Sequence, residues 1–141
     1  MDDRFLHECM FFTANRLGRA ITKIAEEEFA PTGLTPMYGY IIRLVNSEPG
    51  IAQKVLSDKL SIAPSTLTRF IDKLEAKRLV ERKVHGKTVL VYPTPKGEEL
   101  LTEIRSASKR LKERYEAVLS KAFSEQMNVD LNASSELLEK G

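Results

Sequence analysis

Hydroxyl and basic side chains are concentrated in residues 64–73, in a pattern suited to contact with a nucleic acid. The stretch begins Pro64-Ser65-Thr66-Leu67-Thr68-Arg69 and predicts a helix that ends at about residue 77. One face of this helix carries the apolar residues Leu67, Phe70, Ile71 and Leu74. The opposite face carries Ser65, Thr66, Thr68, Arg69, Asp72 and Lys73. Short hydroxyl side chains let a helix approach a groove closely, and an arginine can donate two hydrogen bonds to guanine. A proline at the first helical position costs no hydrogen bond, and the amide donors that are free at the start of a helix suit a phosphate or a base edge.

The neighbouring segments supply the supports that such a helix needs. A short helix is predicted over residues 52–60, with Val55, Leu56 and Leu60 as its apolar stripe, followed by a turn at residues 61–63. After the hydroxyl-rich helix, residues 80–84 and 87–92 predict a basic hairpin whose turn is His85-Gly86. Glycine is expected there because a two-residue turn requires a positive φ. The order helix, turn, helix, hairpin predicts a winged helix-turn-helix.

The distribution of charge supports this interpretation. The whole chain carries a net charge of +2, with a pI of about 8.7. Residues 50–96 contain ten Lys and Arg against four Asp and Glu, a net +6, whereas the remaining residues contain twelve against sixteen, a net −4. A basic module inside an otherwise acidic chain is typical of a protein that binds nucleic acid.

Long amphipathic helices are predicted on both sides of the basic module. Residues 4–29 place apolar side chains near one face over roughly 39 Å of helix, which is more than so short a chain can cover by itself. Pro31 and Gly33 are expected to end this helix, and Thr35-Pro36 to cap and start another, with Met37, Tyr40, Ile41, Leu44 and Val45 facing inward.

The second half of the chain repeats this design. Thr94-Pro95 predicts the start of a helix that runs to about residue 122, and Ser124 is expected to cap a final helix. Apolar stripes that extend beyond a small module need a partner. We therefore expect a mainly α fold with a small β-hairpin wing: an N-terminal dimerisation helix in residues 1–34, a winged helix-turn-helix DNA-binding region in 35–94, and C-terminal dimerisation helices in 95–141.

Other classes of protein find little support in the sequence. One cysteine, Cys9, and two distant histidines, His7 and His85, do not form an ordinary zinc site, and no phosphate-binding loop or nucleophile–base signature is present. We therefore expect no enzymatic activity, no metal and no cofactor. The acidic start and the absence of a long apolar run predict no signal peptide and no membrane span, and the single cysteine suits a reducing cytoplasm. A winged helix can also bind proteins, an alternative that the basic hydroxyl-bearing face disfavours.

The chain resembles the MarR family of bacterial transcriptional regulators. The most specific part of the resemblance is Leu60-Ser61-Ile62-Ala63-Pro64-Ser65-Thr66-Leu67-Thr68-Arg69-Phe70-Ile71-Asp72-Lys73-Leu74-Glu75-Ala76-Lys77-Arg78-Leu79-Val80-Glu81-Arg82, followed by Val91-Tyr92-Pro93-Thr94-Pro95-Lys96-Gly97. The resemblance implies an obligate homodimer that binds a palindromic operator on double-stranded DNA, usually as a repressor. It also implies release by a small molecule, often a phenolic or aromatic acid, or by thiol oxidation.

The predicted DNA contacts divide into two groups. Arg69, with Ser65, Thr66 and Thr68, is expected to touch base edges or adjacent phosphates, while the wing holds phosphates or the minor groove. The full predicted set is Gln53, Ser61, Pro64, Ser65, Thr66, Thr68, Arg69, Lys73, Arg82, Lys83, His85 and Lys87.

Three departures from the family pattern bear on this set. The wing tip is shortened to His85-Gly86-Lys87, so its DNA contact falls to Lys87 or His85, or is lost. Arg78 stands where the family usually has glycine; a positive φ there would cost of order 1 kcal/mol. Ala63, at the start of the recognition helix, has no side-chain acceptor, a role left to Ser61 or Ser65.

Two routes of regulation remain open from the sequence. The predicted effector pocket, for a small aromatic ligand, is lined by Phe12, Arg16, Met37, Tyr38 and Tyr40. The alternative is a thiol-based redox sensor that uses Cys9, with His7 and Arg4 placed to lower the thiol pKa. Each set also has a purely structural interpretation. The aromatic residues can simply belong to the core, and Cys9 can be a small buried hydrophobic residue.

Overall fold

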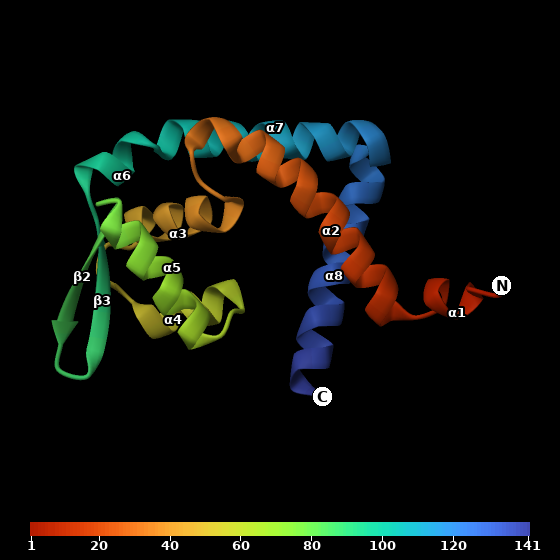
Figure 1. Ribbon diagram of the computed structural model, residues 1–141, viewed down its shortest axis with the longest axis horizontal. Coiled ribbons are helices and arrows are strands. Elements are labelled where there is room, and N and C mark those ends of the chain that lie inside the picture. Colours follow the sequence, from red (N-terminus) through yellow and green to blue (C-terminus); the bar gives the residue numbers. More distant parts are fainter.

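The computed structural model describes all residues, 1–141, and shows a mainly helical chain with one small sheet (Figure 1). The predicted fold class is therefore confirmed. The elements in chain order are α1 (Arg4–His7), α2 (Met10–Phe29), a 3-10 turn η1 (Ala30–Thr32), α3 (Pro36–Ser47), β1 (Ile51–Ala52), α4 (Gln53–Leu60), α5 (Pro64–Ala76), β2 (Val80–His85), β3 (Thr88–Pro93), α6 (Pro95–Glu99), α7 (Leu101–Leu119) and α8 (Lys121–Lys140).

The sheet is antiparallel, with strand order β1-β3-β2. The β2–β3 hairpin is the wing, and β1 adds a two-residue edge in which Ile51 pairs with Val91. This edge strand was not predicted, because two residues are too few to show the alternation of apolar and polar side chains that marks a strand. It ties the entry to α4 directly to the base of the wing.

A closed apolar core holds the helix-turn-helix and the wing together. Its fully buried side chains come from α3, α4, α5 and both wing strands, and Phe29 and Ile104 extend it toward α2 and α7. They are Phe29, Ile41, Ile42, Val45, Leu56, Leu67, Ile71, Leu74, Val80, Val91 and Ile104. Burial of this kind contributes roughly 1.5–3 kcal/mol for each large side chain, so the core fixes the position of α5.

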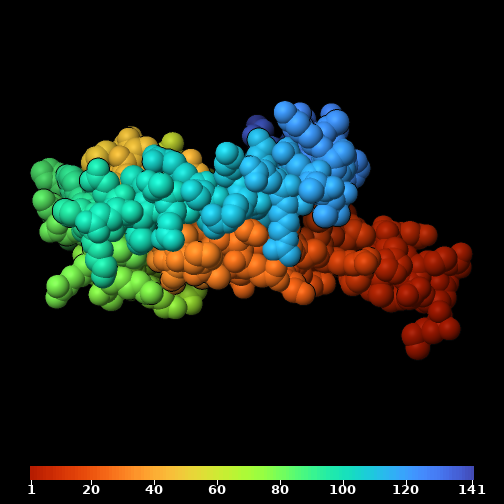
Figure 2. Space-filling view, turned by 90° about the horizontal axis from the view of Figure 1, so that it is seen from above, coloured from red at the N-terminus to blue at the C-terminus, as the bar shows by residue number.

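The long helices form an extended arm on the other side of the molecule. The C-terminal half of α2 lies alongside α7, as Figure 2 shows from above, and the two are joined by Arg110–Glu28 and Arg114–Glu27 ion pairs of 3.2 and 2.7 Å. Beyond this contact α8 turns back, and the N-terminal segment extends past the rest of the chain (Figures 1 and 2). No helix has both the length and the apolar character to cross a membrane.

Several boundaries differ from the sequence-based predictions. The helix predicted over residues 4–29 is interrupted at Glu8 and Cys9, where Cys9 takes an extended conformation (φ −108°, ψ 119°). Phe5 and Met10 are exposed on either side of the break, so no packing holds these first turns in line with α2. Val55, predicted to face inward, is 40% exposed.

The helix predicted over residues 95–122 is divided at Leu100 and ends at Leu119. Ser120 then takes a φ of 77°, and its hydroxyl accepts a hydrogen bond from the Phe123 amide. Ser120 is thus the cap of the last helix, one turn earlier than the predicted Ser124, whose hydroxyl instead donates to the Ser120 carbonyl at 2.7 Å.

Candidate nucleic-acid interface

Helix α5 presents one side to solvent because its other side is locked in the core. Leu67, Ile71 and Leu74 are completely buried, which turns the opposite face outward. Ser65, Arg69 and Lys73 are exposed along that face at intervals of four residues, so they form one stripe. Neither cation of the stripe is held in an ion pair, so both are available to an anionic partner.

The first turn of α5 keeps free hydrogen-bond donors. Ala63 provides no capping side chain, and the Ser65 and Thr66 amides have no partner within the protein. Ser61 lies in the left-handed region (φ 54°) in the exposed turn before the helix, and neither its hydroxyl nor that of Ser65 replaces the missing cap. The compensation expected of these serines is therefore absent, and two amides point outward with the positive end of the helix dipole.

Gln53 and Thr68 bond to each other in the free protein. The Gln53 Nε2 donates to the Thr68 Oγ1 at 3.0 Å, and the Thr68 hydroxyl donates to the Pro64 carbonyl at 3.0 Å. The Gln53 Oε1 is buried without a partner. The hydroxyl of Thr68 is thus used to join α4 to α5, which leaves Ser65 and Thr66 as the free hydroxyls of the first two turns. The roles of Gln53 and Thr68 as DNA contacts stay predictions.

Arg82 in the wing is engaged with the recognition helix. Its backbone amide donates to Glu75 Oε2 at 2.9 Å, and its guanidinium bonds to Glu75 Oε1 at 3.0 Å and to Asp72. The Arg82 amide, by donating to the Glu75 carboxylate, lowers the pKa of Glu75 below its ordinary value of 4.5. The structure therefore gives Arg82 a role in holding the wing against α5, where the sequence predicted a DNA contact.

The wing tip is a two-residue turn formed by Gly86 and Lys87, since His85 pairs with Thr88. The predicted turn, His85-Gly86, is thus displaced by one residue. Gly86 takes the first position with a φ of 65°, which glycine adopts without strain. Lys83, His85 and Lys87 are exposed along the hairpin, and the Lys83 ammonium lies 4.8 Å from the centre of the Tyr92 ring.

A hollow of about 460 Å³ separates the wing tip from the starts of α4 and α5. Its lining includes Lys54, Gln53, Pro64, Lys87 and Thr88, which brings two ammonium groups to the same opening. Lys54 was not among the predicted contacts, because in the sequence it is simply an exposed cation at the start of a helix. Its position opposite Lys87 is visible only once the wing is folded back.

The five residues of the predicted effector pocket do not line a common cavity among those described. Tyr38 packs edge-on against Phe70, Tyr40 against Phe29, and Met37 against the core. Phe12 and Arg16 lie on the N-terminal half of α2, which extends away from α3 (Figure 1). Cys9 is exposed at the break before α2.

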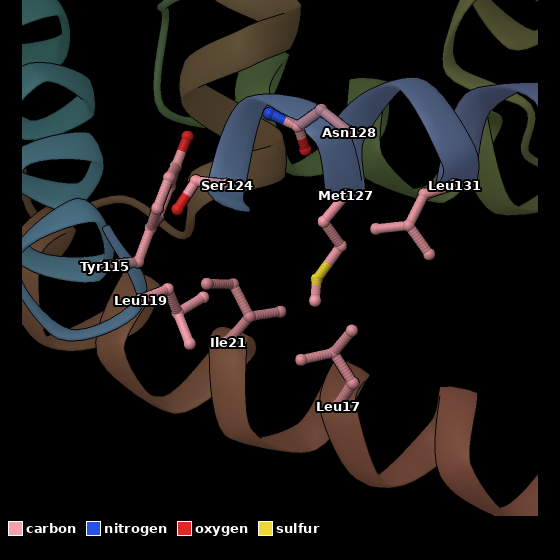
Figure 3. A pocket seen from close by; sticks show the side chains of 8 residues that line it. All are labelled: Leu17, Ile21, Tyr115, Leu119, Ser124, Met127, Asn128 and Leu131. Atoms are coloured by element: carbon pink, nitrogen blue, oxygen red, sulfur yellow. The ribbon is translucent and has the colours of Figure 1, made fainter. Parts of the chain in front are cut away.

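A different hollow lies where α2, α7 and α8 meet (Figure 3). Its volume is about 110 Å³, and six of its eight lining residues are hydrophobic. Leu17, Ile21 and Met127 face one another across it, while Tyr115 and Ser124 lie at one end (Figure 3).

The fold and the exposed α5 face together define a winged helix-turn-helix protein. The sequence model of the MarR family matches residues 32–88. A Bacillus subtilis protein described as an uncharacterised HTH-type transcriptional regulator, YybA, is 29% identical over 93 residues; the match covers 63% of this chain and about three fifths (61%) of that protein's length.

Solved structures share the same fold at low identity. The transcriptional repressor CouR bound to p-coumaroyl-CoA is 20% identical over 96% of this chain and 97% of its own, with a TM-score of 0.86. CouR bound to a 23-mer DNA duplex is 19% identical over 96% of this chain and 98% of its own, with a TM-score of 0.84. The Staphylococcus aureus MepR–DNA complex is 18% identical over 90% of this chain and 96% of its own, with a TM-score of 0.77. The predicted resemblance to the MarR family is confirmed by the match of its sequence model to residues 32–88.

Proposed function

We propose that this protein is a sequence-specific transcriptional regulator that binds double-stranded DNA as a homodimer and represses the genes next to a palindromic operator. The observation that carries the proposal is the stripe of Ser65, Arg69 and Lys73 on α5, unpaired and held outward by a closed core. In this proposal Arg69, which is exposed and unpaired, makes a bidentate contact with guanine. Lys54, Lys83 and Lys87 supply phosphate contacts from α4 and the wing.

The arm supports the proposal of a dimer. Met10, Phe11, Val118, Leu119, Phe123, Val129, Leu131, Leu137 and Leu138 are exposed on α2, α7 and α8. Met10, Phe11, Leu131 and Leu138 also line an open hollow of about 720 Å³ between α2 and α8. Exposed apolar residues that gather in one hollow mark an interface. Because this hollow combines residues from near both ends of the chain, it suits a second copy of the same chain as the partner. Residues 1–34 and 95–141 would then be dimerisation segments around the DNA-binding region 35–94.

Regulation by a small molecule is the second part of the proposal. CouR, similar in fold, is a repressor that binds p-coumaroyl-CoA. In this chain the hollow between α2, α7 and α8 is apolar, and its volume of about 110 Å³ is smaller than the cavity of about 150 Å³ that holds benzene, so an aromatic ring bound there would have to widen it. Because it joins the arm helices, a ligand there would alter DNA binding only if it bound one arm arrangement better than the other. The alternative is a thiol sensor at the exposed Cys9.

DNA binding is tested by selecting bound sequences from a random duplex pool, followed by salt titration of the selected site. We expect a palindrome whose half-sites lie about one DNA turn, ~34 Å, apart, and a steep loss of affinity with salt. The matched control is Lys112→Ala, which removes an exposed cation of α7 outside the proposed interface. Enrichment of no motif, or a stable monomer in sedimentation at micromolar concentration, would contradict the proposal.

The two routes of release are separated with the Cys9→Ser variant. Operator release by small neutral aromatic compounds from both the wild type and Cys9→Ser is expected, with the effect abolished by Leu17→Phe, which fills the hollow. If low concentrations of peroxide release only the wild type, the thiol is the sensor and the small-molecule route is wrong.

A further inference from the structure

Three consecutive carbonyls at the end of the recognition helix face the first turn of α6. The Lys77 carbonyl accepts a hydrogen bond from Lys96 Nζ at 3.1 Å, and the Arg78 carbonyl accepts one from Thr94 Oγ1 at 2.8 Å. The third carbonyl, that of Leu79, lies so near Gly97 that a Cβ added there would be 2.3 Å from the oxygen. Real Cβ atoms do not approach a backbone oxygen this closely, so glycine is required for the contact.

The hydroxyl of Thr94 serves both segments at once. It accepts a hydrogen bond from the Gly97 amide at 3.0 Å, which caps α6, while it donates to Arg78. Both of these bonds depend on one oxygen atom. A change in the start of α6 therefore cannot occur without a change in its contact with the end of α5.

The end of α5 is itself rigid. The Leu79 amide bonds to the Leu74 carbonyl at 2.9 Å and the Arg78 amide to the Glu75 carbonyl at 2.8 Å, with Arg78 in the left-handed region at φ 61°. This is the Schellman arrangement of a helix C-terminus. Arg82 ties the base of the wing to the last turns of the same helix. Recognition helix, wing base and the first turn of α6 thus form one body.

The other side of α6 is joined to the arm by hydrogen bonds that span the division at Leu100. The Leu100 amide bonds to the Gly97 carbonyl at 3.1 Å, and the Ile104 amide to the Leu100 carbonyl at 2.9 Å. Ile104, Ala107 and Leu111 of α7 are buried against the core. Without the contacts of Thr94 and Gly97, α5 and α7 would be related only by the covalent connection through Pro93, the Lys96–Lys77 hydrogen bond and the apolar packing.

We infer that Thr94 and Gly97 are positioning residues, which clamp the start of α6 to the end of α5 and thereby set the spacing of the two recognition helices in the dimer. This inference rests on the proposed function. The clamp fixes the direction of the arm relative to the DNA-binding module. In a dimer joined through the arms, the two modules can then bind two half-sites at the same time. Loss of the clamp leaves each module intact and widens the range of directions that the arm can take, within the limits set by the packing of Ile104 and Ala107.

The test compares Thr94→Val and Gly97→Ala with the conservative Thr94→Ser. Valine has the shape of threonine but removes both hydrogen bonds; serine keeps them; alanine displaces Leu79 from Gly97. Each variant is titrated against DNA with two half-sites and against a duplex with one half-site. We expect the first two variants to lose about tenfold or more on the double site and little on the single site, because joint engagement of linked sites depends on their geometry. Thr94→Ser should behave as the wild type.

A distance measurement gives a readout that does not depend on DNA. Nitroxides are placed at positions 87 and 112 of one chain in a Cys9→Ser background, diluted with unlabelled chain, and measured by double electron–electron resonance. The clamp predicts a narrow distribution for Thr94→Ser and a broad one for Thr94→Val and Gly97→Ala, at unchanged far-ultraviolet circular dichroism. Equal losses on single and double sites, or unchanged distributions, would overturn the inference. A wild type that binds no DNA while the distributions still broaden would refute the proposed function and leave the clamp standing.

Discussion

The winged helix-turn-helix and the helical arm are built from equally clear apolar patterns, yet the two regions use them differently. Ile71 in the first is completely buried, whereas Leu131 and Leu138 in the second are 44% and 72% exposed. The first region buries its stripe in its own core, and the second leaves apolar side chains exposed on the surface of the chain. The comparison teaches that a helical stripe predicts burial but does not say whether the chain itself or a second molecule covers it.

The largest expected effect contrasts the two regions through matched truncations. Ile71→Ala should destabilise the protein by about 2–5 kcal/mol, because it leaves a cavity in a closed core, at any protein concentration. Leu131→Ala should act through association, so that its melting temperature approaches that of the wild type at high concentration. Thermal unfolding over a hundredfold range of concentration checks both. Equal and concentration-independent losses would show that the arm is not an interface.

The second contrast lies within the basic face. Arg69→Ala should weaken operator binding by about 1–3 kcal/mol and relax the sequence preference, because a bidentate base contact is lost. Lys87→Ala should weaken specific and random DNA alike and reduce the slope of affinity against salt. Titrations of each variant on both kinds of DNA decide the matter. If both variants lose the same affinity on specific and on random DNA, Arg69 does not contact a base edge.

A smaller effect concerns the attachment of the wing. The Arg82 amide lowers the pKa of Glu75, so the contribution of this pair to stability is complete above about pH 4.5 and is lost as the pH falls through the lowered pKa. Glu75 is 37% exposed, so the contribution is below about 1 kcal/mol. The chemical shift of the Arg82 amide should follow this titration while core methyl signals do not. Glu75→Gln is the control and should abolish the transition.

The smallest effect is expected at the end of the recognition helix. Arg78 has a φ of 61°, and Arg78→Gly relieves this strain while it adds freedom to the unfolded chain, for a net gain below about 1 kcal/mol. Lys77→Gly, at the adjacent position with φ −83°, should instead lose stability. Urea denaturation measures the free energy of unfolding of the two variants. A loss of stability for Arg78→Gly as large as that for Lys77→Gly would show that Arg78 is not strained.

Most of the fold could be predicted from the sequence, because strong local signals mark it. Thr35-Pro36 and Thr94-Pro95 cap and start helices as predicted. The elements that escaped prediction depend on tertiary context: β1 exists only because β3 lies beside it. The break at Cys9 lies where the flanking side chains Phe5 and Met10 are exposed rather than buried in the chain's own core.

The sequence predicted which residues lie on the surface of the candidate site, but not the hydrogen bonds and ion pairs between their side chains. Residue type placed Thr68 and Arg82 on the list of DNA contacts, and only coordinates show that one is bonded to Gln53 and the other to Glu75. Lys54 has no distinguishing neighbour in the sequence and joins the site through the folded wing. Side-chain pairing across elements is long-range information that a local pattern does not hold.

The recognition helix starts without a capping side chain, and this limits how far its stability can be raised without a cost to binding. Replacement of Ala63 by serine would give the Ser65 and Thr66 amides an internal acceptor and a gain of about 1 kcal/mol. The same donors would then be satisfied before any target arrived, so the added robustness would come at the expense of affinity. Under the proposed function, selection for heat tolerance and selection for tight DNA binding would therefore favour different residues at this position.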